Sequence, residues 1–106
     1  LQEVVDSKDI FLFIGTENDE IVGTISLVVY KIPTGNKAWI EDVIVDETMR
    51  GKGYGRKLML HAIEFAKSRG ISKINLTSNP TRIAANKMYQ QLGFEQYITN
   101  MYRLEV

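Results

Sequence analysis

The spacing of apolar residues changes near Asp46, and this change limits the fold more than any other feature of the sequence. Before Asp46, apolar residues come in nearly continuous, β-favouring runs at 10–14, 21–30 and 38–45. Runs of this kind, separated by turn-forming residues, predict three buried strands that follow one another as a meander. After Asp46, apolar residues recur at the spacing of helices. The chain therefore joins a strand-rich half to a half that contains helices.

A first helix is predicted directly after the glycine-rich basic stretch 50–57. Its apolar positions fall on one helical face, and Gly70 follows the last of them as a C-terminal cap. The opposite face is polar and includes the single histidine, His61, to which we assign no catalytic role. Residues 73–78 then alternate between polar and apolar and predict a strand.

A second helix is predicted after this strand. Asn79 is a good N-cap, Pro80 suits the first helical position, and Gly93 closes the helix. The β-favouring residues 94–106 predict a last strand or hairpin. The resulting order, β-β-β-α-β-α-β, joins a meander to a crossover unit. It predicts an α+β (mixed α/β) fold with a mostly antiparallel central sheet and helices packed on it.

Length and composition fit one domain that covers residues 1–106. A chain of 12.1 kDa with 44% apolar residues has room for a single core. It has no cysteine and one histidine, which disfavours a disulfide framework, a cysteine nucleophile and a metal site. No apolar run approaches the roughly 20 residues of a membrane helix. The acidic start of the chain is also unlike a signal peptide, so we expect a cytoplasmic protein without a membrane partner.

The stretch from Arg50 to Gly55 has the composition of a phosphate-binding turn. Three glycines alternate with other residues, and Arg50 and Lys52 add positive charge. Glycine permits φ > 0 and lets an anion approach backbone N–H groups, here beside the positive end of a helix dipole. The spacing does not match a dinucleotide fingerprint, since Arg56 takes the third glycine position, nor a P-loop, since Gly53 follows Lys52. The alternative interpretation is a flexible basic connection.

Two blocks of the chain resemble the GNAT family of acyl-CoA N-acyltransferases. The segment 40–55 is similar to the family's acyl-CoA-binding signature, Arg/Gln-x-x-Gly-x-Gly/Ala after a central strand, and matches it at Arg50, Gly53 and Gly55. The segment 79–94 is similar to the family's downstream helix, with its Ala-x-x-x-Tyr and Leu-Gly-Phe pattern. Two blocks in the right order make the resemblance more specific than either block alone.

The resemblance spans Phe11 to the C-terminus and implies both a fold and a cosubstrate. It places a first strand and two helices before Leu1, so the chain would be an N-terminally incomplete domain. It implies that acetyl-CoA lays its pyrophosphate on the amides of the glycine turn and its pantetheine arm along 43–45, where the sheet splays open. The cofactor-binding residues implied in this way are Val43, Ile44, Val45, Arg50, Gly51, Lys52, Gly53, Tyr54, Gly55 and Asn86. Arg82 departs from the asparagine that the family often has at its position, and it would reach a phosphate or form a salt bridge.

The resemblance also implies two catalytic residues, Tyr89 and Glu41. Tyr89 matches the family's position for the acid that protonates the departing CoA sulfur, and a phenol with a pKa of about 10 stays protonated at neutral pH. Glu41 matches the position that takes the amine's proton, directly or through water, or binds the amine as an ammonium ion. Each has a structural alternative: Tyr89 completes an apolar helix face, and Glu41 pairs with a lysine or arginine. The resemblance suggests the amide of Val43 as the donor to the thioester oxygen.

The resemblance therefore implies an N-acetyltransferase that moves the acetyl group of acetyl-CoA to a primary amine by direct attack within a ternary complex. An acyl-cysteine intermediate is excluded because the chain has no cysteine. The alternative from another class is a catalytically inactive CoA-binding module that acts as a sensor or interaction domain. A nucleic-acid partner is disfavoured because the net charge is zero. We expect a monomer or a homodimer.

The zero net charge conceals two halves of opposite sign. Residues 1–47 hold ten acidic and three basic residues, and residues 48–106 hold ten basic and three acidic ones. The basic half contains the elements assigned to the anionic cosubstrate, and the acidic half contains Glu41. This division predicts an acceptor side whose local field attracts a cationic amine.

Overall fold

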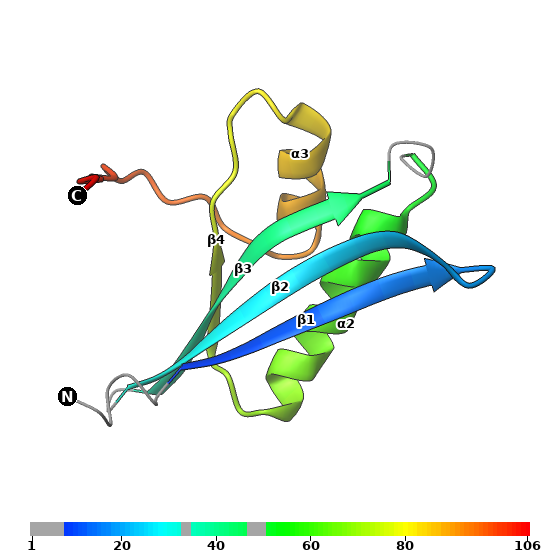
Figure 1. The fold of residues 1–106 in the computed structure, drawn as a ribbon. Helices are drawn as coiled ribbons and strands as arrows, with labels where there is room; N and C mark the ends of the chain where they lie inside the picture. The colour runs from blue at the N-terminus through cyan, green and yellow to red at the C-terminus, as the bar shows by residue number, and fades with distance from the viewer. Residues whose placement is uncertain (1–7, 33–34, 47–50) are drawn as a thin grey trace.

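The computed structural model describes residues 8–32, 35–46 and 51–106 (Figure 1). Its elements are β1 (Lys8–Glu17), β2 (Glu20–Ile32), β3 (Gly35–Val45), α2 (Tyr54–Ser68), β4 (Lys73–Leu76) and α3 (Ile83–Gln91). They follow the predicted order as far as the second helix. The strands form one sheet in the order β1-β2-β3-β4, in which β1, β2 and β3 pair antiparallel and β4 pairs parallel to β3. The predicted α+β fold class is confirmed.

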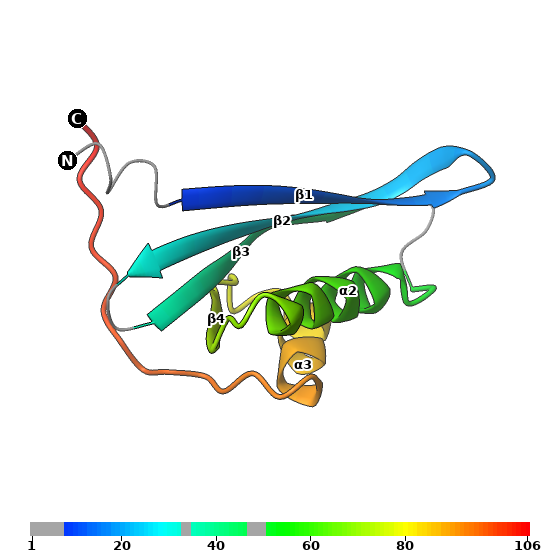
Figure 2. The same ribbon diagram turned by 90° about the horizontal axis from the view of Figure 1, so that it is seen from below.

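Both helices lie on one side of the sheet (Figure 2). Alternate residues of β2 and β3 point toward them and are buried, namely Ile25, Leu27, Val29, Ala38 and Ile40. They pack against α2 residues that recur at helical spacing, namely Leu58, Met59, Ala62 and Ala66. Full burial of a Leu, Ile or Met side chain stabilises a fold by about 1.5–3 kcal/mol, so this layer is the main source of stability. On the other face of the sheet, β1 exposes Ile10, Leu12 and Ile14.

A pair of glycines lets α2 approach the β1–β2 hairpin closely. Gly15 of β1 lies opposite Gly23 of β2 in the antiparallel register. A Cβ atom at Gly23 would lie 2.8 Å from Cδ1 of Leu58 and 2.9 Å from the carbonyl oxygen of Ile44, closer than non-bonded atoms pack. The start of α2, which follows the glycine-rich turn, is therefore fixed against the sheet.

Both helices end at the glycines that the sequence indicates. Gly70 has a left-handed φ of 73°, and its N–H donates to the carbonyl oxygen of Lys67 at 3.1 Å, while the N–H of Ile71 donates to that of Ala66 at 3.1 Å. This pair of bonds is the Schellman motif, which satisfies carbonyl groups that the helix leaves free. Gly93, with φ 102°, closes α3 with the same pattern. Neither helix in the described residues is long and apolar enough to cross a membrane.

Asn79 does not cap α3, contrary to the prediction. The helix begins at Ile83, with Arg82 as its N-cap residue. The side-chain oxygen of Asn79 accepts hydrogen bonds from the N–H and the hydroxyl of Thr81, both at 2.9 Å. An asparagine that binds the residue two positions further on forms an Asx-turn, which competes with helix capping. The chain therefore makes one more turn before the helix begins.

The predicted last strand over 94–106 is not formed, and this part of the predicted element order is wrong. After α3 the chain has no regular secondary structure, and Figure 1 shows it leaving the sheet beyond β4. The side chains of Ile98, Tyr102 and Leu104 are 101%, 89% and 84% exposed. A β-favouring composition forms a strand only where a partner supplies ladder hydrogen bonds. Here the neighbouring edge strand, β4, is only four residues long.

Candidate active site

The site is built where β3 and β4 part. The two strands pair in parallel only from Lys37 and Lys73 to Ile40 and Leu76. β3 then continues to Val45, whereas β4 ends and the chain turns toward α3. This divergence, the splay implied by the sequence, opens a cleft of about 450 Å³. The cleft is lined by Ile40, Glu41, Val43, Ile44, Leu76, Thr77, Arg82 and Tyr89.

β3 carries a bulge beside this cleft. Asp42 and Val43 both face Ile25 of β2, one residue more than a regular antiparallel ladder allows. The extra residue shifts which positions of β3 point toward the core. Before the bulge the even-numbered Ile40 faces the core, and after it the odd-numbered Val43 and Val45 pack against the core. A bulge leaves one residue outside the ladder of hydrogen bonds. The bulge lies at Val43, and the predicted role of the Val43 amide as a donor stays a prediction.

The glycine-rich turn follows the end of β3. Arg50, one of the predicted phosphate contacts, lies outside the described residues, and Lys52 is exposed. Gly51 and Gly53 have left-handed φ values of 83° and 82°, and a Cβ atom at either would meet nothing within 4 Å. Gly53 is the N-cap residue of α2. The turn therefore presents open backbone at the N-terminus of a helix, which is the arrangement that binds phosphate.

Gly55 joins this turn to the cleft strand. A Cβ atom at Gly55 would lie 3.7 Å from Cγ2 of Val45, so the first turn of α2 packs on the last residue of β3. Val43 and Val45 are half-buried, and Ile44 between them is exposed. A ligand that runs along 43–45 would therefore lead from the cleft to the glycine turn.

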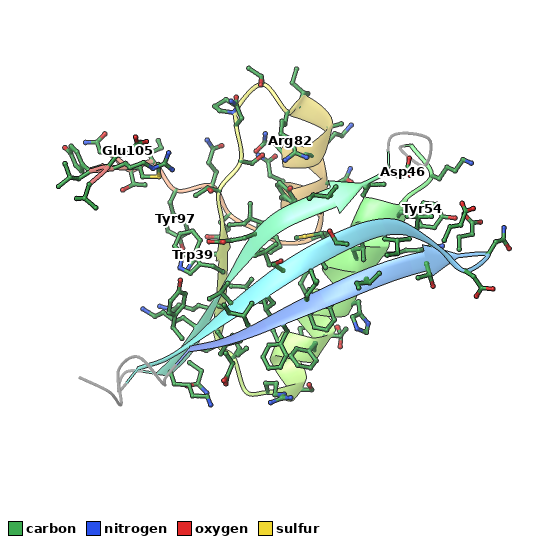
Figure 3. The ribbon with its side chains drawn as sticks, viewed as in Figure 1. Trp39, Asp46, Tyr54, Arg82, Tyr97 and Glu105 are labelled. Carbon is green, nitrogen blue, oxygen red and sulfur yellow. The ribbon has the colours of Figure 1, made fainter. Side chains whose placement is uncertain are left out.

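Tyr54 ties the turn to the β1–β2 hairpin. Its hydroxyl donates a hydrogen bond of 2.5 Å to Oε2 of Glu17, the last residue of β1 (Figure 3). The ammonium group of Lys57 lies 5.5 Å from the centre of the Tyr54 ring. The hydrogen bond to Glu17, followed by desolvation and the charge of that carboxylate, raises the pKa of Tyr54 above its ordinary value. Tyr54 thus positions the start of α2, and its predicted contact with the cofactor stays a prediction.

We expect the contact between Tyr54 and Glu17 to break when Tyr54 ionises in alkali. Because the folded-state pKa of Tyr54 is raised, the contact is complete below the unfolded value of about 10 and is lost as pH rises through the folded pKa. Ultraviolet titration of the tyrosines should therefore show one group that ionises later than the others. Glu17→Gln should remove this late step, whereas Tyr102→Phe, at an exposed position, should leave it in place. Identical titrations of the unchanged protein and Glu17→Gln would show that the contact does not form in solution.

Tyr89 belongs both to the core and to the cleft. The residue is 6% exposed, and its ring centre lies 6.2 Å from that of Phe94 in an edge-on arrangement. It also borders the cleft from α3, across from β3. The apolar packing suggested by the sequence and a position beside a bound ligand are therefore compatible. The packed ring gives the hydroxyl a fixed place, which a proton donor needs.

Glu41 borders the cleft from β3, immediately before the bulge. Its side chain is exposed. It forms no ion pair with any described residue, so the structural alternative of a paired carboxylate finds no support in that part of the chain. Within the described part of the chain, the carboxylate lies beside the cleft and its predicted role as a base or amine-binding group stays a prediction.

Asn86 is turned back toward the loop that precedes its own helix. Its side-chain Nδ2 donates hydrogen bonds to the carbonyl oxygens of Asn79, at 3.0 Å, and of Arg82, at 2.7 Å. It is not among the residues that line the cleft. Asn86 therefore fixes the turn that leads into α3, and its predicted contact with the cofactor stays a prediction.

Four cleft residues were not assigned to the cleft from the sequence, and two of them, Arg82 and Thr77, are polar; the others are Ile40 and Leu76. Thr77 directly follows β4, and ligands of α/β sheets bind beyond the carboxyl ends of strands, so its position was a usable signal. The signal at Arg82 is its departure from the asparagine of the resemblance. Arg82 forms no salt bridge with a described residue. Of its two expected roles, the salt bridge therefore has no support in that part of the chain, and contact with a phosphate stays a prediction.

Known proteins match the chain in both sequence and fold. The model of the Acetyltransferase (GNAT) family matches residues 2–94. The chain is 33% identical over 89 residues to the mycothiol acetyltransferase of Renibacterium salmoninarum and 36% identical over 84 residues to the glucosamine 6-phosphate N-acetyltransferase of Trypanosoma brucei brucei. These matches cover 82% and 76% of the chain but 26% and 55% of the relatives, so the chain spans about a quarter and about half of their lengths. Its fold is similar to that of a putative acetyltransferase from Agrobacterium tumefaciens, with a TM-score of 0.84 and 30% identity over 98% of this chain and 74% of that one.

Proposed function

Because the chain belongs to the acetyltransferase (GNAT) family, we propose that it transfers the acetyl group of acetyl-CoA to a primary amine by direct attack in a ternary complex. The observation that carries this proposal is that Tyr89 and Glu41 border the same cleft. One wall of the cleft is β3, and the glycine turn packs against the end of this strand through Gly55. A module that only binds CoA needs the turn but has no use for a buried phenol and a carboxylate on opposite sides of one cleft. The inactive module is therefore the weaker alternative.

The described residues fit the donor. Acetyl-CoA supplies an acetyl group activated as a thioester. Its phosphates would lie at Gly51 and Gly53, where side chains would take the space that the ligand needs and where the start of α2 favours negative charge. Its pantetheine arm would add to the β3 backbone at 43–45, beyond the point where β4 ends.

The side chains around the cleft can perform the proton transfers. The amine nitrogen attacks the thioester carbonyl carbon, a C–N bond forms and the C–S bond breaks. The N–H of Val43 stabilises the negative charge that develops on the carbonyl oxygen. Glu41 takes the proton that the amine must lose, and Tyr89 gives its phenolic proton to the departing sulfur. These roles use one side chain from each side of the cleft and one backbone donor of β3.

The proposal is tested by measuring CoA release from acetyl-CoA with a panel of primary amines. We expect a rate above that of the amine alone, together with formation of the N-acetyl product. Acetyl-CoA binding by calorimetry, without turnover of any amine, would favour the inactive binding module. Absence of both binding and turnover would contradict both assignments.

We expect Glu41→Gln to lower kcat/KM for the amine at neutral pH by about 100-fold, the lower range for loss of a general base. The loss should shrink as pH rises toward the pKa of the amine, because the amine then loses its proton to solvent. The kcat/KM profile against pH checks this. Glu64→Gln, on the exposed face of α2, is the matched control and should leave the profile unchanged. A Glu41→Gln profile that matches the unchanged protein would remove the base role.

We also propose that the acceptor is a small amine. Two relatives, a mycothiol acetyltransferase and a glucosamine 6-phosphate N-acetyltransferase, are named after small molecules, which supports a small acceptor for this chain. In this chain the acidic first half, with Glu41 at the cleft, supports an acceptor that arrives with a positive charge.

A further inference from the structure

The cleft contains a positive charge that the proposed acetyl transfer does not require. Arg82 borders the cleft at the start of α3 (Figure 3), and Glu41 borders it from β3. Neither side chain forms an ion pair with any residue that the structure describes. Two opposite charges therefore line one cleft without neutralising each other.

The loop before α3 gives Arg82 a defined place. Its N–H donates to the carbonyl oxygen of Asn79 at 3.0 Å, and its own carbonyl oxygen accepts a hydrogen bond of 2.7 Å from the side chain of Asn86. The Asx-turn of Asn79 with Thr81 stiffens the same loop. These hydrogen bonds hold the backbone of Arg82, so the side chain starts from a fixed point beside the cleft.

A guanidinium suits one kind of ligand group best. Its planar fork of N–H donors matches a carboxylate with two parallel hydrogen bonds, and such charged bonds are stronger than neutral ones. The proposed roles of Tyr89, Glu41 and the Val43 amide complete acetyl transfer without it. The positive charge of Arg82 is therefore free to act in selection of the acceptor.

We propose that the acceptor is a zwitterion, an amine with a carboxylate a few bonds away as in a free amino acid, whose carboxylate binds Arg82 while its amino group faces Glu41. This inference rests on the proposed function and adds the acceptor class to it. A simple cationic amine would be attracted by Glu41 but repelled by Arg82, whereas a zwitterion satisfies both charges and is oriented by them. Arg82 would thus determine specificity without taking part in the proton transfers.

Matched pairs of amines test this inference. L-phenylalanine and phenethylamine, and L-lysine and cadaverine, differ only in the carboxylate. We expect kcat/KM for the carboxylated member of a pair to exceed that for its partner by about 10- to 100-fold, the range for a hydrogen bond to a charged group. Arg82→Gln should reduce this ratio to about one, mainly through the KM of the amino acid.

Two further variants separate a specific contact from a general effect of charge. Arg82→Lys keeps the charge but loses the fork, and should retain only part of the preference. Lys87→Gln removes a positive charge from an exposed position of α3 that does not line the cleft, and should leave the ratio unchanged.

The outcomes distinguish this inference from the proposed function. If plain amines are acetylated as well as their carboxylated partners, the zwitterionic acceptor is wrong and the acetyltransferase stands. If Arg82→Gln raises the KM of acetyl-CoA and leaves the acceptor ratio unchanged, Arg82 serves the phosphates of the donor instead. If no amine is acetylated, the proposed function itself fails.

Discussion

Replacing Gly53 with valine should abolish measurable acetyl-CoA binding. Gly53 has φ 82° and ψ 10°, a left-handed conformation that costs an L-residue about 1–2 kcal/mol and a β-branched residue more. The new side chain would also stand in open space that the phosphates need in order to reach the backbone N–H groups. Isothermal titration calorimetry should show a saturable heat for the unchanged protein and none for the variant.

Gly70→Val is the control for strain alone. Gly70 has φ 73°, and a Cβ atom there also meets nothing within 4 Å. It lies just beyond the opposite end of α2, so the 15 helical residues separate the two glycines by about 22 Å. Both variants should lose similar thermal stability, but Gly70→Val should still bind acetyl-CoA. Normal affinity in Gly53→Val would show that the turn does not hold the phosphates.

Tyr89→Phe should lower kcat by about 100- to 10,000-fold, the range for loss of a general acid. The ring is buried against Phe94, and phenylalanine keeps that packing, so the melting temperature should change little. The KM of acetyl-CoA should also change little, because the hydroxyl acts on the sulfur only as it departs. Steady-state kinetics at saturating amine, with thermal unfolding alongside, measures the three quantities.

Tyr97→Phe controls for removal of a phenol in general. Tyr97 is 77% exposed and does not line the cleft, so this change should leave kcat as it is. A fully active Tyr89→Phe would remove the acid role and leave solvent as the proton source.

The regular elements of the fold were predictable because each has a local cause. The apolar runs gave the three strands of the meander, and the glycines at 70 and 93 marked helix ends that both adopt left-handed φ values. The two predictions that were wrong, the Asn79 cap and the last strand, concern residues that can adopt more than one local structure. Asn79 has two satisfactory uses, a helix cap and an Asx-turn, and residues 94–106 form a strand only beside a partner. Such outcomes depend on what lies nearby in space.

The site shows the same division between local and long-range causes. The glycine turn was predicted from neighbouring residues, because alternating glycines and basic residues form a local pattern, whereas Tyr89 was assigned through the resemblance. The bulge in β3 was not predicted, although apolar positions shift from 38 and 40 to 43 and 45. Arg82 had one signal in the sequence, its departure from the asparagine of the resemblance. The additional turn before α3 and the hydrogen bond from Asn86 to the Arg82 carbonyl oxygen were not predicted.

Gly53, at the start of α2, makes the stability of the fold depend on the concentration of its proposed cosubstrate. A helix begins with N–H groups that lack partners within the helix, and Gly53 has no side chain with which to cap them. An anion bound there would complete the helix, and a ligand at 100 times its dissociation constant stabilises a folded protein by about 2.7 kcal/mol. A cell that runs short of coenzyme would then hold a protein that is both idle and easier to degrade.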